Sequence, residues 1–88
     1  MRTKDDQQLI AKYLDLDTHR YPGGRADARL RDAGVSVWAI VAFLRVYHGD
    51  VDQVAEHFGL SREQVEAALA YYQQNKKYVD ARIALNEA

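Results

Sequence analysis

The chain has 88 residues, 28% of them charged, with a formal net charge of −1. This length fits one small domain. No cysteine is present, which excludes disulfides and thiolate metal sites.

Residues 1–24 are predicted to hold a short helix and a flexible turn. The helix is expected over residues 5–14, where apolar side chains repeat at helical spacing at Leu9, Ile10, Tyr13 and Leu14. The turn is indicated by Tyr21-Pro22-Gly23-Gly24. No apolar run of signal-peptide or membrane-span length follows the charged first residues, so we expect a cytoplasmic protein without membrane contact.

The segment from Ala28 to Val35 can form a short strand or an extended arm, although a helix beginning at Ala26 fits nearly as well. A single strand leaves its backbone groups without partners, so a strand here is expected to pair with its own copy in a second subunit. Residues 19–31 hold four arginines against one aspartate, whereas residues 50–70 hold one arginine against five carboxylates. Contacts with phosphate are therefore expected from the basic segment, at Arg20, Arg25, Arg29 and Arg31.

Three helices are predicted between residues 36 and 72. Ser36 is placed to cap a helix over residues 37–48, which Gly49 ends. The spacing of Ala55, Gly59 and Val65 is typical of a helix-turn-helix, in which a small residue, a left-handed glycine and an apolar residue let two helices meet closely. The helix starts carry capping pairs, Asp50 with Gln53 and Ser61 with Gln64. We therefore predict an all-α domain over residues 25–88, with a small helix-turn-helix and a long C-terminal helix.

A heptad seam continues the last of these helices, through Val65, Leu69, Tyr72, Lys76, Val79 and Ile83. The run Gln73-Gln74-Asn75 can bend or break it. The seam is longer than the core of a single small bundle, so its far half is expected to meet another chain. The sequence thus predicts a homodimer, held by Tyr72, Lys76, Val79 and Ile83.

Catalytic chemistry is not indicated. The three histidines, at positions 19, 48 and 57, lack the spacing of a metal site, and Ser36 and Ser61 are better explained as helix caps than as nucleophiles. Asp50 and Asp52 could act as an acid and base pair, but their position at a helix start is explained by the helix dipole. We expect no enzyme, no catalytic residue, no metal and no cofactor.

Two binding surfaces are candidates. Trp38, Tyr71 and Tyr78 lie off the main helical stripes and can form an exposed patch for a protein partner, although a core role for the aromatic rings is an equally good interpretation. Stacking on single-stranded nucleic acid lacks the positive charge that it needs. The helix-turn-helix can read DNA or be purely structural. If it reads DNA, the contacting residues are expected to be Ser61, Arg62 and Gln64 in the major groove, with Arg29 and Arg31 nearby.

Two stretches resemble a known family. They are Gly34-Val35-Ser36-Val37-Trp38-Ala39-Ile40-Val41, and Glu66-Ala67-Ala68-Leu69-Ala70-Tyr71-Tyr72 with the later Asp80-Ala81-Arg82-Ile83. They are similar to the small antitoxin-like family catalogued as domain of unknown function 433, over roughly residues 25–86. The resemblance implies a homeodomain-like three-helix domain that acts as the antitoxin of a bacterial type II toxin-antitoxin pair.

On this resemblance, the partner is a toxin with a PIN-like ribonuclease fold. An antitoxin needs no chemistry of its own, because it only has to occlude the acidic site of the nuclease. Toxin binding is then expected from the residues Arg20, Arg25, Arg29, Arg31, Trp38 and Tyr71. Repression of its own operon, through operator DNA, would be a second role. The alternatives are a stand-alone helix-turn-helix transcriptional regulator and a scaffold that only dimerises.

Overall fold

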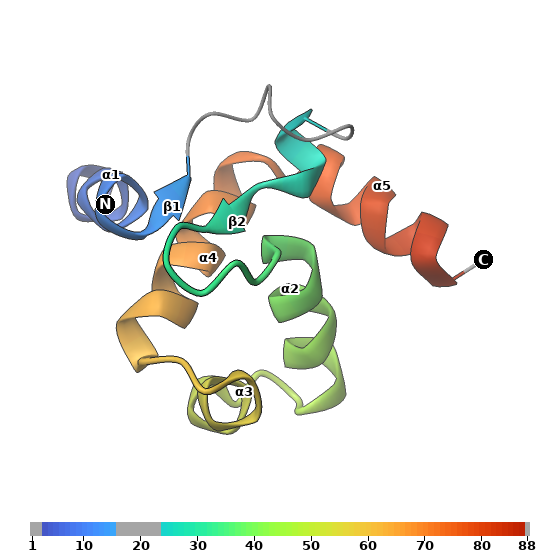
Figure 1. The fold of residues 1–88 in the computed structure, drawn as a ribbon. Helices are drawn as coiled ribbons and strands as arrows, with labels where there is room; N and C mark the ends of the chain where they lie inside the picture. The colour runs from blue at the N-terminus through green and yellow to red at the C-terminus, as the bar shows by residue number, and fades with distance from the viewer. Residues whose placement is uncertain (1–2, 16–23, 88) are drawn as a thin grey trace.

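The computed structural model describes residues 3–15 and 24–87. These residues are mostly helical, as expected, with one two-stranded sheet. In chain order the elements are α1 (Thr3–Tyr13), β1 (Leu14–Asp15), η2 (Gly24–Asp27), β2 (Arg29–Leu30), α2 (Val37–Val46), α3 (Val51–Phe58), α4 (Arg62–Gln74) and α5 (Lys76–Glu87) (Figure 1). Arg20 and most of the predicted Pro-Gly turn lie outside the described residues. No helix in the described part of the chain is both long and apolar enough to cross a membrane.

The short strand predicted after Ala28 is present, but its partner comes from the same chain. β2 pairs antiparallel with β1, and Leu30 lies opposite Leu14. Both leucine side chains are almost completely buried. The expectation of pairing with a second subunit is therefore wrong, because the residues that follow α1 supply the hydrogen-bonding edge.

α2 begins where the sequence predicted and ends two residues early. Ser36 has the extended backbone of an N-cap, but its side chain makes no capping hydrogen bond. At the other end, His48 and Gly49 adopt positive φ angles of 57° and 84°. The Gly49 N–H donates to the carbonyl oxygen of Leu44 at 2.7 Å, which closes the last turn.

The connection between α3 and α4 is a tight turn with capped helix ends. The Asp50 side chain accepts a hydrogen bond from the N–H of Gln53, and Gly59 ends α3 in the left-handed region at φ 69°. Ser61 and Gln64 form a complete capping box at the start of α4. The predicted caps and turn glycine are confirmed for these two helices.

Replacing Ser61 by alanine is expected to lower the free energy of unfolding by about 1 kcal/mol, because the N–H of Gln64 loses its acceptor. Chemical denaturation measures this loss. Ser36→Ala is the matched control, since Ser36 makes no side-chain cap bond, and it should cost only a few tenths of that amount. Equal losses for the two variants would contradict the cap assignment.

The long C-terminal helix is broken where the glutamine-rich run predicted. α4 ends at Gln74, and the Asn75 side chain donates to the carbonyl oxygen of Tyr71 at 3.0 Å. After this break α5 packs against α2 and η2, as Figure 1 shows. Val79 and Ile83 are buried in their own chain, at 0% and 1% exposure. Their predicted role in a dimer is therefore wrong. Because the chain changes direction at Asn75, the far half of the seam packs in the core of its own chain.

Candidate functional site

Two arginines lie over two aromatic rings where η2, α2 and α5 meet. The Cζ atom of Arg25 is 5.3 Å from the centre of the Tyr78 ring, and that of Arg82 is 4.5 Å from the centre of the Trp38 ring. Tyr78 is 45% exposed and Trp38 is half-buried. We call these four residues the arginine-aromatic surface. Arginine is suited to such stacking because its planar guanidinium is weakly hydrated.

Asp27 fixes one of the two arginines. Its Oδ1 atom accepts a hydrogen bond from Nε of Arg82 at 3.1 Å, and the carboxylate side chain is only 15% exposed. The terminal nitrogens of a guanidinium held through Nε can still donate to a partner. The ring of Trp38 lies against the same guanidinium, so two contacts restrict the orientation of Arg82.

Tyr71 lies beneath this surface and not on it. It is 6% exposed, and its hydroxyl donates to the backbone carbonyl oxygen of Arg25 at 2.9 Å. Burial raises the pKa of the Tyr71 phenol, and the charge of Arg25 partly opposes this. The prediction of Tyr71 as an exposed contact is wrong, because the side chain fills the core and holds η2 in place.

The described part of the basic segment, residues 24–31, forms η2 and β2 and not an extended arm. Arg31 donates to three carbonyl oxygens around the end of α1, those of Ala11, Lys12 and Leu14, at 3.2, 3.2 and 2.8 Å. Arg29 is half-buried in β2. Of the predicted toxin contacts, Arg25 and Trp38 both belong to the arginine-aromatic surface. Arg31 instead anchors α1, and Arg20 lies outside the described residues. The interactions of Arg31 join residues 17 to 20 positions apart, which local sequence patterns do not reveal.

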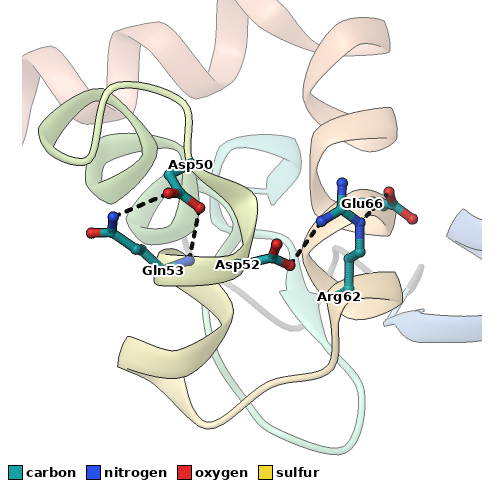
Figure 2. A network of polar contacts seen from close by, with 5 residues as sticks. All are labelled: Asp50, Asp52, Gln53, Arg62 and Glu66. Carbon is teal, nitrogen blue, oxygen red and sulfur yellow. Dashed lines mark hydrogen bonds and ion pairs between the residues drawn. The ribbon is translucent and has the colours of Figure 1, made fainter.

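The residues predicted to read DNA are engaged within the chain. Ser61 and Gln64 bond to each other in the capping box. Arg62 lies between two carboxylates, with Nη1 at 2.7 Å from Asp52 and Nε at 3.3 Å from Glu66 (Figure 2). The hydrogen bond with Asp52 raises the pKa of Arg62 above its ordinary value. The start of α4 is thus an acidic surface whose one arginine is already paired.

α1 covers one side of α4. Tyr13 donates its hydroxyl hydrogen to Glu63 at 2.5 Å, and the side-chain amide of Gln7 donates to Gln74 at 3.2 Å. These contacts show that α1 runs antiparallel to α4. Together with the paired Arg62, they leave α4 a poor surface for approaching phosphates.

No group of three or more potential metal-ligating side chains occurs among the described residues. The structural features therefore define a small, mostly helical protein whose distinctive surface pairs arginines with aromatic rings.

A family model described as protein of unknown function (DUF433) matches residues 24–72, which is more than half of the chain, and the protein belongs to this family. No curated protein and no solved structure gives a significant match. The matched region begins with η2 and ends at Tyr72, near the C-terminal end of α4. It contains Arg25 and Trp38, whereas Tyr78 and Arg82 follow it in α5. Sequence reasoning singled out Tyr78 as an exposed aromatic residue. It missed Arg82, for which the only signal was the Asp80-Ala81-Arg82-Ile83 stretch.

Proposed function

We propose that this protein is the antitoxin of a bacterial type II toxin-antitoxin pair, and that it binds and neutralises a PIN-like ribonuclease through the arginine-aromatic surface. The observation that carries the proposal is the pair of guanidiniums held over aromatic rings, Arg25 on Tyr78 and Arg82 on Trp38. The resemblance to antitoxin-like proteins supports the choice of partner.

A ribonuclease site that binds divalent cations is lined with carboxylates, and guanidinium groups bind carboxylates through two parallel hydrogen bonds. Side chains that are already held in place lose less conformational entropy on binding. The ion pair with Asp27 and the stacking on Trp38 supply this order for Arg82. The rings of Trp38 and Tyr78 add apolar contact area of the kind that dominates interface energetics.

Co-expression with the product of the neighbouring reading frame, followed by pull-down and a ribonuclease assay, tests the proposal. Arg25→Ala is expected to weaken inhibition by about tenfold or more, because a partner carboxylate loses its counter-charge. The control is Arg62→Ala, which removes the same charge from the exposed start of α4 and should leave inhibition unchanged. Full inhibition by Arg25→Ala, with loss of inhibition by Arg62→Ala, would overturn the assignment of the surface.

A second candidate function is transcription regulation by a homeodomain-like helix-turn-helix formed by α2, α3 and α4, either alone or as autorepression of the antitoxin's operon. The tight, capped turn at Gly59 between α3 and α4 favours it. The engaged side chain of Arg62 and the acidic surroundings oppose it. Fluorescence anisotropy with the DNA upstream of the gene decides this point. A DNA-reading α4 would bind this fragment with a strong dependence on salt, and Arg62→Ala would weaken the binding.

A further inference from the structure

Two shallow apolar grooves lie on either side of Leu69, a half-buried residue of α4. The first groove, of about 330 Å³, faces α1 and is lined by Leu9, Val51 and Leu69, with carboxylates at Asp6 and Glu66. The second, of about 350 Å³, faces α2 and is lined by Leu44, Leu69 and Tyr72, with Arg45 and His48 at its rim. Leu69 belongs to both, so the apolar floor is continuous across α4. We call this surface the Leu69 trough.

The two rims of the Leu69 trough carry opposite charges. Asp6 and Glu66 line the α1 side, where Glu66 also pairs with Arg62 at 3.3 Å, and Arg45 and His48 line the α2 side. Arg45 also forms an ion pair with Asp80 at 2.8 Å. At the edge of the second groove, the ammonium nitrogen of Lys76 lies 5.8 Å from the centre of the Tyr72 ring and adds a cation.

Asp6 and Arg45 lie at matching levels along α4. α1 runs antiparallel to α4 with Gln7 opposite Gln74, which places Asp6 beside the C-terminal half of α4. Arg45 reaches the same half, because its partner Asp80 also accepts a hydrogen bond from the hydroxyl of Tyr72 at 2.8 Å. Around the helix, Glu66 and Tyr72 project on opposite sides of Leu69, since successive residues are spaced 3.6 to the turn.

We propose that the Leu69 trough binds a second copy of this chain through a two-fold axis that runs along α4. Such an axis places the α1 side of each chain over the α2 side of the other. Leu69 then packs on Leu69 of the other copy, and Asp6 faces Arg45. An isologous interface must be complementary to itself, and opposite charges on the two sides of one apolar strip satisfy this requirement.

This dimer differs from the one that the heptad seam predicted. It retains Tyr72, which lines the second groove, and it places Lys76 at the rim. Val79 and Ile83 have no part in it, because they are buried within their own chain. The arginine-aromatic surface is formed by different residues, so the dimer does not depend on the proposed function.

Sedimentation equilibrium of the full chain is the first test, with the wild type expected to be a dimer at micromolar concentrations. Leu69→Lys should weaken association by about tenfold or more, because a charge is buried at the centre of the apolar strip. Leu85→Lys is the matched control. Leu85 is 73% exposed on α5, so this variant should associate like the wild type. Circular dichroism verifies that both variants are folded. A monomeric wild type, or a dimer that survives Leu69→Lys, overturns the proposal.

A charge-swap experiment tests the pairing itself. Asp6→Lys places two cations opposite each other at each symmetric contact, and Arg45→Glu places two carboxylates there, so each variant alone should dimerise about tenfold more weakly than the wild type. Mixing the two restores opposite charges at both contacts, and heterodimers should form. The double variant Asp6→Lys/Arg45→Glu should also recover the homodimer, and it tests the same contact within one chain. Failure of both the mixture and the double variant to associate overturns the proposed axis.

Discussion

Replacing Ile83 by alanine is expected to lower the free energy of unfolding by about 2–5 kcal/mol, the range for truncating a large aliphatic side chain in a packed core. Ile83 is 1% exposed and lies with Val79 on the buried face of α5. The loss would be a large part of the stability of so small a domain. Urea denaturation measures it, and an unchanged m value would show that the native state keeps its compactness.

The matched control for Ile83→Ala is Leu85→Ala, two residues further along α5. Leu85 is 73% exposed, so its truncation should change stability by no more than about 0.5 kcal/mol. The heptad interpretation makes the opposite prediction for Ile83, namely dissociation of a dimer with the folded monomer left intact. A stable, monomeric Ile83→Ala protein obtained from a dimeric wild type would contradict the packing of α5 described above.

The sequence was most informative where structure depends on neighbouring residues. The caps at Asp50 and Ser61 and the left-handed Gly59 involve partners within five residues, and all three are present. The break at Asn75 was also predicted, from the run Gln73-Gln74-Asn75. The new direction of the chain after the break was not predicted. A heptad pattern describes one continuous helix, and once the chain turns at Asn75 the positions of Val79 and Ile83 face the protein's own core.

In the candidate site, too, contacts between residues far apart in the sequence could not be predicted from local patterns. The composition of residues 19–31 drew attention to the arginines, and the off-stripe aromatics drew attention to Trp38 and Tyr78. The pairing of Arg82 with Asp27 spans 55 positions, and no periodicity encodes it. Tyr71 appeared exposed because it lies off the main stripe of α4. The structure buries it, and its hydroxyl donates to the backbone carbonyl oxygen of Arg25 in η2.

Arg31 was predicted from the sequence to contact a partner, whereas in the structure its side chain binds the end of α1. Arg31→Ala is expected to lower the free energy of unfolding by about 1–3 kcal/mol, because the charged side chain holds the carbonyl oxygens of Ala11, Lys12 and Leu14 at the end of α1. Hydrogen exchange should become faster in α1, which packs along α4, while α3 keeps its protection. Arg31→Lys should recover only part of the loss, since an ammonium group cannot reproduce the fork of a guanidinium.

The ribonuclease assay separates this structural role from the binding role that the basic segment first indicated. If Arg31 only anchors α1, Arg31→Ala loses stability but inhibits the nuclease fully at temperatures where it remains folded, whereas Arg25→Ala keeps its stability and loses inhibition. If Arg31→Ala is instead as stable as the wild type and defective in inhibition, Arg31 contacts the toxin. That result would also mean that its three carbonyl contacts contribute nothing to holding α1 against the body of the protein.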